Sequence, residues 1–338
     1  MLTFPSIDTF IRDTEQEMLA VIEAAEDPRT TQLYEWIRYH LGLDGDAPRG
    51  KRLRPLLGLL AYRSIAGEHA RALPGAAAVE MGHNFSLVHD DIQDASPERR
   101  HRPALWTTIG IAQAINTGDA LFTLSRLALH RLTDIGFPAH RVLALMRLYD
   151  ETCLALCEGQ FIDIRNADRI EWPGVDEYFD MIGRKTAALI AGSVQSGAML
   201  ATDDAAVIDA YRRFGWALGV AFQLNDDLLG IWGDEAATGK EPSDIEARKK
   251  TLPLIHALEH GVPADRERLR RILAGDHPSP DEVVEARAIL ARAGSEAFTR
   301  ARAHHHRDEA IAHLEASGAV GGEAIERLRQ IVGSAISA

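Results

Sequence analysis

Apolar residues recur at intervals of three and four along almost the whole chain, and this spacing limits the fold more than any other feature. Leu121, Leu124 and Leu127 show it, and runs that alternate apolar with polar residues are nearly absent. Intervals of three and four place side chains on one face of an α-helix, whereas a strand needs an interval of two. Proline residues divide the pattern into pieces of helical length. The sequence therefore predicts an all-α protein.

The predicted helices are joined without an obvious domain boundary. No low-complexity linker and no repeated unit divides the 338 residues, and a chain of this length can bury one large core. We therefore expect residues 1–338 to form a single domain, a helical bundle around a central cavity. The segment Ser279-Pro280-Asp281-Glu282 predicts a capping box at the start of one of its helices.

Charge and composition restrict the partners of such a bundle. The formal net charge of -13 repels phosphate backbones, so we expect no nucleic acid partner, and a phosphorylated ligand would need a local basic cluster or bound cations. The two cysteines, Cys153 and Cys157, are too few for a disulfide framework. No stretch approaches the roughly 18 apolar residues of a membrane span. These features predict a cytoplasmic protein with no integral membrane segment.

The first basic cluster is the segment GKRLRP at 50–55. Lys51, Arg52 and Arg54 lie where a helix is expected to begin, and free backbone N–H groups at a helix N-terminus favour a phosphate. Positive side chains at this end oppose the helix dipole, which favours a binding role. Taken alone, the segment also fits an ordinary basic helix start.

An acidic cluster follows at the end of another apolar helix. Asp90 and Asp94 lie one helical turn apart on the same face, where two negative charges repel each other unless a cation lies between them. Carboxylate oxygens suit Mg²⁺, which usually shares itself with substrate phosphates. Arg99 and Arg100 add donors for those phosphates. Together with Asp91, these residues predict a site for a metal ion and a diphosphate.

A second pair of aspartates, Asp226 and Asp227, interrupts a nearly continuous apolar helix. Unpaired charges would be costly there. Two acidic clusters far apart in sequence are explained if their helices face each other across a cavity and hold metal ions between them. Lys185 and Thr186 lie on a further apolar helix and, alone, would indicate only a lysine at a helix face.

Taken together and in order, these segments resemble the trans-isoprenyl diphosphate synthases of the polyprenyl synthetase family, over about residues 30 to 338. The matching motifs are GKRxRP at Gly50 to Pro55, Glu80 and His83, the aspartate-rich motif at Asp90 to Asp94 with Arg99 and Arg100, Gly159-Gln160, Lys185-Thr186, FQxxDD at Phe222 to Asp227, and Gly239-Lys240.

This resemblance implies an isoprenoid synthase fold and a prenyltransferase that joins isopentenyl diphosphate to an allylic diphosphate. The residues implied for the diphosphate of isopentenyl diphosphate are Lys51, Arg54, His83 and Arg100. Those implied for the allylic diphosphate are Arg99, Lys185 and Lys240, with Lys250 as a further substrate-binding candidate. Those implied for three Mg²⁺ ions are Asp90, Asp94 and Asp226, followed by Asp91 and Asp227. Thr186 and Gln223 would line the site of the allylic cation.

The chain departs from the family pattern at two positions. Gly230 stands where the second motif commonly ends in a third aspartate, so one outer carboxylate is missing. His101 stands where a glycine usually follows the arginine pair. We expect the first change to weaken metal affinity without abolishing catalysis, because Asp226 and Asp227 remain.

Product length is predicted from the helix that carries the first motif. Phe85 and Ser86 lie five and four residues before Asp90, and at 1.5 Å per residue Phe85 is about 7.5 Å along the helix. An aromatic residue at this place and a small one after it resemble family members that stop at geranylgeranyl diphosphate (C20). Farnesyl diphosphate (C15) is the next alternative, and Phe85 also fits plain core packing.

Other functions are less consistent with the motifs. A terpene cyclase would not need the second-substrate residues Lys51, Arg54 and His83. A helical metallohydrolase would explain His89-Asp90, but the chain has no second Glu-x-x-His to complete a di-iron site. A non-catalytic subunit would explain Gly230 but not an intact first motif. The family resemblance also implies a homodimer.

Overall fold

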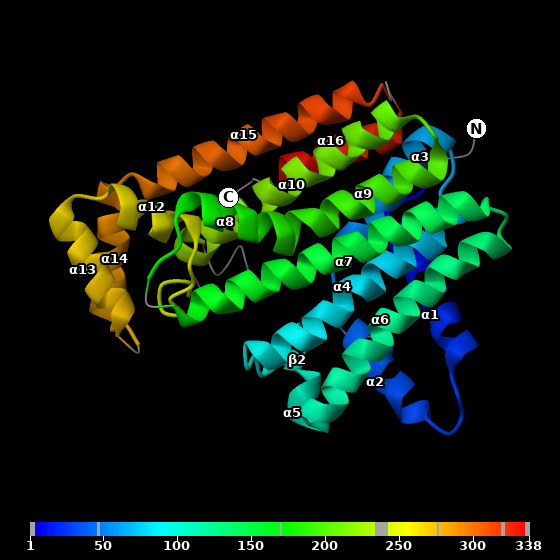
Figure 1. Ribbon diagram of the computed structural model, residues 1–338, viewed down its shortest axis with the longest axis horizontal. Coiled ribbons are helices and arrows are strands. Elements are labelled where there is room, and N and C mark those ends of the chain that lie inside the picture. The colour runs from blue at the N-terminus through cyan, green and yellow to red at the C-terminus, as the bar shows by residue number, and fades with distance from the viewer. Residues whose placement is uncertain are drawn as a thin grey trace. The chain divides into compact units, whose positions relative to one another are not determined.

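The structure is a computed structural model that describes residues 4–45, 48–169, 171–233, 243–275, 277–318 and 322–334. Helices make up most of it (Figure 1), and the strands of the described residues are two short ones, β1 (Glu98–Arg99) and β2 (Arg102–Pro103), paired antiparallel as a hairpin. The all-α prediction is confirmed.

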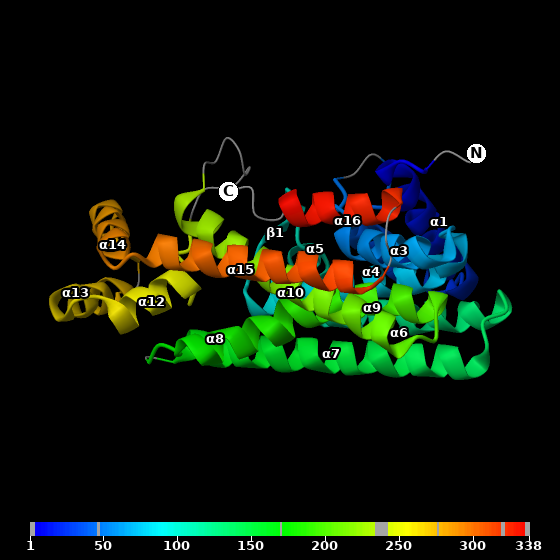
Figure 2. The ribbon, with the colours of Figure 1, turned by 90° about the horizontal axis from the view of Figure 1, so that it is seen from above.

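The order of the helices along the chain can be followed by colour in Figures 1 and 2. They are α1 (Ile7–Ala25), α2 (Thr31–Leu41), α3 (Leu53–Ala66), the 3-10 turn η1 (Ala70–Ala72), α4 (Leu73–Gln93), α5 (Leu105–Ile109), α6 (Ile111–Asp134), α7 (Ala139–Asp168), α8 (Val175–Ile182), the π-helical turn η2 (Gly183–Ala187), α9 (Ala188–Ala201), α10 (Ala205–Trp232), α12 (Leu252–His260), α13 (Pro263–Ala274), α14 (Pro280–Arg292), α15 (Ser295–Ala316) and α16 (Glu323–Ser334).

The chain divides into two compact units, each made of three stretches. The first contains Met1–Cys153, Gly192–Tyr211 and Ser317–Leu328, and the second contains Leu154–Ala191, Arg212–Ala316 and Arg329–Ala338. The expectation of a single domain over 1–338 stays a prediction.

In the first unit, α4 is the central helix. It runs alongside α6 and also contacts α1 and α3. Residues 56–62 of α3 are buried on every side, as expected of a helix enclosed by others. A side chain at Gly197 of α9 would come within 2.1 Å of the Gly58 carbonyl oxygen, so this crossing of α3 and α9 requires glycine. The basic segment and the first acidic motif are thus attached to well-packed helices.

In the second unit, one core cluster joins α8, α10 and α12 through Tyr178, Leu224 and Ile255. A second cluster joins the end of α10 to α12, α13 and α14. The capping box is confirmed at the start of α14, where the Glu282 N–H donates to Ser279 Oγ at 3.3 Å and the Ser279 N–H donates to the Glu282 carboxylate at 3.1 Å. The second acidic motif lies on α10, between the two core clusters.

The structure also bears on the expectations about the two cysteines and about a membrane span. No disulfide joins the cysteines, of which Cys153 is buried and Cys157 is exposed, so only the first packs as a small core residue. None of the helices in the described part of the chain has the length and apolar character needed to cross a membrane.

Candidate functional site

The basic segment at 50–55 is fixed by one of its own arginines. Arg52 is the N-cap of α3 and has a φ of 49°, in the left-handed region. Its buried guanidinium donates to Glu15 at 3.1 Å and to Glu80 at 2.8 Å. Arg52 therefore faces the core rather than a phosphate, contrary to the expectation that it joins Lys51 and Arg54 in binding one. Lys51, by contrast, is exposed.

Arg54 and His83 contact each other between α3 and α4. Arg54 Nη1 lies 3.0 Å from His83 Nε2, and because a guanidinium can only donate, the histidine nitrogen is the acceptor. Burial and the nearby arginines hold the pKa of His83 well below its usual value, so the ring is neutral. Arg54 Nε is buried and has no hydrogen-bond partner among the described residues. His83 thus holds the positively charged guanidinium of Arg54 in place, and the Nε–H of Arg54 can still donate to an anion.

Arg100 completes this basic group. Its guanidinium passes so close to the backbone of the basic segment that a Cβ at Gly50 would lie 3.0 Å from Nη2. It is held by the His40 carbonyl oxygen and by Asn84 Oδ1, each at 3.1 Å. The structure therefore brings Arg54 to His83 and Arg100 to the backbone before Lys51. All four residues predicted to bind isopentenyl diphosphate lie in the first unit.

The aspartates of the first motif have different surroundings. Asp90 is half-buried near the end of α4, and Asp94 is exposed just after it, with its N–H donating to the Asp90 carbonyl oxygen at 2.8 Å. They are one turn apart, as the sequence predicts. Asp91 is buried and accepts from Arg99 Nε at 2.9 Å and Nη2 at 2.5 Å. Burial raises the pKa of Asp91, and the Arg99 guanidinium opposes that rise. Arg99 is thus paired with Asp91, and its contact with a diphosphate stays a prediction.

The hairpin explains the glycine that the family has at position 101. Arg100 and His101 join β1 to β2, and both have positive φ, 55° and 59°. A two-residue hairpin turn of this kind favours glycine, because a side chain is strained in the left-handed region. His101 therefore adopts a backbone conformation that suits glycine better. The turn directs Arg99 to Asp91 and Arg100 to Asn84.

In the second unit, the carboxylate of Asp227 is enclosed by neutral donors. It accepts from the Tyr178 hydroxyl at 2.5 Å, from Gln223 Nε2 at 3.1 Å and from the Leu252 N–H at 2.9 Å. Leu252 is the first residue of α12, so Asp227 satisfies an N–H that the helix itself leaves unpaired. Burial raises the pKa of Asp227 to about 6, against the lowering effect of Lys249 and these donors. Its role as a metal ligand stays a prediction.

Asp226, its neighbour, is directed outward. Its side chain is 57% exposed and lies 3.9 Å from Lys249 Nζ. Of the adjacent pair Asp226 and Asp227, it is the one accessible to a metal ion. In the sequence, Lys249 stands beside Lys250 after the second aspartate pair, and no role in the site is predicted for it.

Lys250 itself is used to hold a loop. Its ammonium donates to the carbonyl oxygens of Asn166, Arg169 and Glu171, the last two at 2.7 and 3.2 Å. It also lies 5.5 Å from the ring centroid of Trp172. Lys249 is therefore the better candidate for a charge at the acidic site. The predicted residue Lys240, with Gly239, lies outside the described residues.

The predicted catalytic residues Thr186 and Gln223 form a chain of hydrogen bonds that ends at Asp227. The Thr186 hydroxyl donates to Gln223 Oε1 at 2.9 Å, and Gln223 Nε2 donates to the carboxylate. These bonds fix the Gln223 amide in one orientation. The threonine oxygen retains lone pairs that a cation can approach.

Lys185 lies in the π-helical turn η2, an irregularity that is frequent at functional sites. Its ammonium is paired with Asp163 at 2.5 Å. A Cβ at Gly159 on α7 would lie 2.3 Å from the Lys185 backbone nitrogen. The glycine of the Gly159-Gln160 motif therefore allows α7 to pack directly against this turn.

The carboxylates do not form a closed metal site. Among the described residues, no group of three or more His, Cys, Asp or Glu side chains is close enough together to bind an ion. Mg²⁺ commonly keeps several waters, binds through one or two carboxylates and takes its other ligands from substrate phosphates. The carboxylates of Asp90 and Asp94 in the first unit, and that of Asp226 in the second, are donors of the kind that this chemistry uses.

Phe85 belongs to an aromatic cluster in the first unit. It is 8% exposed, its ring centroid lies 5.0 Å from that of Phe122 on α6, and Phe122 lies 6.4 Å from Tyr149 on α7. Tyr149 in turn fits against Gly82, where a Cβ would lie 2.1 Å from its hydroxyl. Rings from α4, α6 and α7 thus form one cluster that includes Phe85, the residue that the sequence predicts as a floor.

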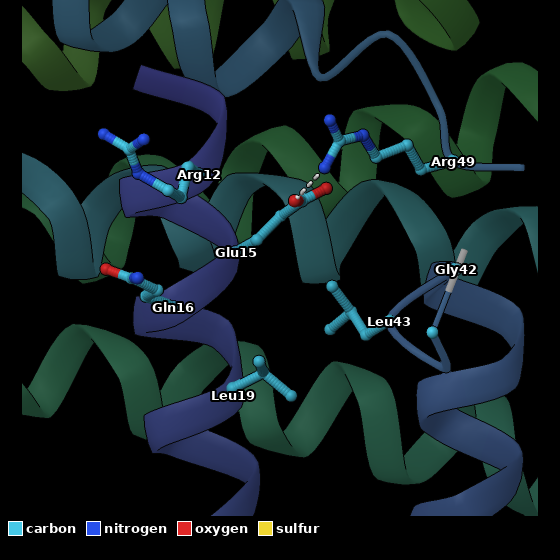
Figure 3. Close-up of a pocket in the computed structure, with 8 residues that line it drawn as sticks. Arg12, Glu15, Gln16, Leu19, Gly42, Leu43 and Arg49 are labelled. Atoms are coloured by element: carbon cyan, nitrogen blue, oxygen red, sulfur yellow. Dashed lines mark hydrogen bonds and ion pairs between the residues drawn. The ribbon is translucent and has the colours of Figure 1, made fainter. Parts of the chain in front are cut away.

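A cavity of about 450 Å³ lies between α1 and the turn after α2 (Figure 3). Arg12, Leu19 and Leu43 line it, and Arg49 donates to Glu15 across it at 2.7 Å. None of the predicted site residues lines this cavity. Its contribution to the site is the carboxylate of Glu15, which also holds Arg52.

Comparisons with protein families and with curated proteins all identify prenyl diphosphate synthases as similar to this chain. A family model described as polyprenyl synthetase matches residues 32–290. A (2E,6E)-farnesyl diphosphate synthase of Mycobacterium tuberculosis is 38% identical over 286 residues, which cover 81% of this chain and 78% of that protein. A geranylgeranyl diphosphate synthase of the same species is 38% identical over 300 residues, covering 87% and 83%.

The solved structures that resemble this chain are also prenyl synthases. A geranylgeranyl pyrophosphate synthetase from Pyrococcus horikoshii superposes with a TM-score of 0.88 at 30% identity, covering 98% of this chain and 97% of that one. A polyprenyl synthase from Caulobacter crescentus, solved with calcium and isoprenyl diphosphate, superposes with a TM-score of 0.80 at 27% identity, covering 100% and 99%.

Proposed function

The chain belongs to the polyprenyl synthetase family and is an isoprenyl diphosphate synthase, and we propose that it condenses isopentenyl diphosphate with an allylic diphosphate to give geranylgeranyl diphosphate. The observation that carries the two-substrate reaction is the basic group around Arg54, His83 and Arg100, which lies in the same unit as the first acidic motif. A cyclase has no use for a second diphosphate site of this kind.

In the proposed reaction, Lys51, Arg54 and Arg100 bind the diphosphate of isopentenyl diphosphate. The neutral His83 accepts a hydrogen bond from Arg54 and so fixes the direction of its remaining donors. Because these guanidiniums are held in place before substrate binds, little reorganisation is needed when it does.

Asp90, Asp94 and Asp226 are the proposed metal ligands, and the calcium in the Caulobacter crescentus relative supports a divalent ion. Bound Mg²⁺ would neutralise the negative charge that develops on the departing diphosphate. Lys185, and in our proposal Lys249, add positive charge. The Thr186 hydroxyl, held by Gln223, presents its oxygen toward developing positive charge on the allylic carbon.

The C20 product is the finer part of the proposal, because the two Mycobacterium tuberculosis relatives are named for C15 and C20 synthesis respectively. Phe85 supports C20. Its ring packs against Phe122 of α6, which is in turn stacked on Tyr149 of α7, so it is well supported as a barrier to a growing chain. Its place relative to the product stays part of the proposal.

The deciding measurement is an incubation of the purified protein with labelled isopentenyl diphosphate and, separately, dimethylallyl, geranyl or farnesyl diphosphate. Each reaction is run with Mg²⁺ or with EDTA, and the products are separated by chromatography. A Mg²⁺-dependent C20 diphosphate is expected. A C15 product, or one longer than C20, would support the condensation reaction and contradict the role of Phe85 as the floor. A hydrocarbon product would indicate a cyclase.

Phe85→Ala tests the floor directly. Removing the ring opens space along α4, so products longer by one or more isoprene units are expected. Phe137→Ala is the matched control, because Phe137 is buried to a similar extent in the same unit but lies off α4. Unchanged product length in Phe85→Ala would remove the floor assignment.

We also propose that the enzyme is a homodimer. Ile111 and Ile115, one turn apart on α6, are large apolar residues that are 53% and 43% exposed in the single chain, and such side chains are often covered by a partner. Light scattering of the wild type and of Ile115→Glu is the test. We expect the wild type to be a dimer and Ile115→Glu to be a monomer, and a monomeric wild type would refute the proposal.

The cytoplasmic location stays a prediction.

A further inference from the structure

The space that a side chain at Gly230 would need is already filled. An ideal Cβ at this position would lie 2.0 Å from Asp244 Oδ2 and 2.4 Å from Asp244 Cγ. Gly230 is the position at which the second acidic motif lacks its third aspartate. The group in that space is itself a carboxylate, and it comes from a residue 14 positions later in the sequence.

The backbone fixes Asp244 at this place. Its N–H donates to the Gly230 carbonyl oxygen at 3.1 Å, and the Lys249 N–H donates to the Asp244 carbonyl oxygen at 2.9 Å. The turn at 244–249 is thus attached to the last part of α10. The Asp244 side chain is only 13% exposed, so its carboxylate is directed against the helix rather than into solvent.

A cation already lies between the carboxylates of this region. Lys249 Nζ is 3.8 Å from Asp244 Oδ1 and 3.9 Å from Asp226 Oδ2. A shielded carboxylate is costly unless a positive charge compensates it. The position of this ammonium shows that Asp226 and Asp244 together attract positive charge to the space between them.

We propose that Asp244 supplies the outer carboxylate that the second acidic motif lacks at Gly230. The two residues form a matched pair, because glycine at 230 leaves the space that the Asp244 carboxylate occupies. Asp244 acts as a positioning residue: it contributes negative charge beside Asp226 and holds Lys249, and it acts on a bound ion through water or through those side chains. This inference rests on the proposed function, in which Asp226 binds the metal.

The experiment measures the affinity of the full-length protein for Mn²⁺ in the presence of inorganic diphosphate, from the electron paramagnetic resonance signal of free Mn²⁺. Asp244→Asn keeps the size of the side chain and removes its charge. We expect it to weaken Mn²⁺ binding about 10-fold, since residues that act behind the direct ligands commonly contribute 10- to 100-fold. Glu246→Gln, an equal charge change at an exposed residue of the same turn, is the matched control and should bind as the wild type does.

Gly230→Ala gives an independent test, because it removes no charge. Its methyl group must displace the end of the Asp244 side chain, so it should weaken Mn²⁺ binding as Asp244→Asn does, with a melting temperature close to that of the wild type. The exchange variant Gly230→Asp with Asp244→Gly returns a carboxylate to the usual position and should recover affinity, which a purely structural role would not predict.

The outcomes separate this inference from the proposed function. If Asp226→Asn weakens Mn²⁺ binding but folded Asp244→Asn and Gly230→Ala bind as the wild type does, the role of Asp244 is overturned and the metal site stands. If Asp226→Asn has no effect either, the assignment of Asp226 as a metal ligand fails, and the inference about Asp244 fails with it.

Discussion

The two aspartate pairs, Asp90-Asp91 on α4 and Asp226-Asp227 on α10, look alike in sequence but are stabilised differently. In each pair the second residue is buried and the first is more accessible. Asp91 is held by a guanidinium, that of Arg99. Asp227 is held by a hydroxyl, an amide and a backbone N–H.

The difference shows that the role of the same Asp-Asp dipeptide depends on the side chains and backbone groups that contact it. A direct ion pair with Arg99 joins Asp91 on α4 to the hairpin and opposes the rise that burial causes in the pKa of Asp91. Neutral donors leave the charge of Asp227 uncompensated in direct contact, and burial therefore raises its pKa to about 6. In our proposal the more accessible aspartates bind the metal, and the buried ones hold the residues around them in place.

The largest effect is expected from the accessible aspartates. Asp94→Asn and Asp226→Asn each remove charge from a proposed metal ligand, so kcat should fall by about 100-fold or more, while the melting temperature stays within about 2 °C. Steady-state kinetics with saturating Mg²⁺ and thermal denaturation measure the two quantities. Near-normal kcat in either variant would contradict this division of roles.

Asp227→Asn should instead reduce stability. The amide has one acceptor oxygen in place of two, so at least one of the donors from Tyr178, Gln223 and Leu252 loses its partner. The free energy of unfolding should fall by about 2 kcal/mol at pH 7, the usual cost of a buried unpaired donor. Urea denaturation measures it, with Asp226→Asn as the control of equal charge change, for which little loss is expected.

The stability conferred by Asp227 should also depend on pH. Because its pKa is about 6 in the folded chain and 3.8 is the ordinary value, the folded state binds a proton between pH 4 and 6 that the unfolded state has released. This contribution is therefore present below about pH 4 and is lost as pH rises through 6, by about 3 kcal/mol.

The measurement compares wild type and Asp227→Asn by urea denaturation at pH 4, 5, 6 and 7. The other titrating groups cancel in the difference between the two proteins. That difference should be larger at pH 4 than at pH 7, and the opposite trend would show that the Asp227 pKa is lowered by folding.

The smallest effect is expected at the hairpin that holds Asp91. His101→Gly removes a side chain from a residue with a φ of 59° and should raise the free energy of unfolding by about 0.5 kcal/mol. For comparison, Asp91→Asn in the otherwise wild-type protein should lower the free energy of unfolding by about 1 to 2 kcal/mol, because its ion pair with Arg99 is broken. A destabilised His101→Gly would show that the histidine side chain makes a compensating contact.

Much of the site was predictable because its motifs are local. The spacing of Asp90 and Asp94, the capping box at Ser279 and each single motif of the family resemblance depend on residues within a few turns of each other, and helix geometry fixes such relations. The positions that were less predictable depend on distant partners. Arg52 faces Glu15 and Glu80, and nothing in the spacing of 50–55 distinguishes it from Arg54.

The sequence by itself determined the helical class, the order of the charged motifs and the family, because each depends on residue type and short-range spacing. The tertiary structure alone decided that Asp227 caps α12, that Lys249 rather than Lys250 lies at the acidic site, and that the carboxylate of Asp244 fills the space at Gly230. Burial and the identity of a charge's partner depend on which segments pack together, and local periodicity carries no record of that packing.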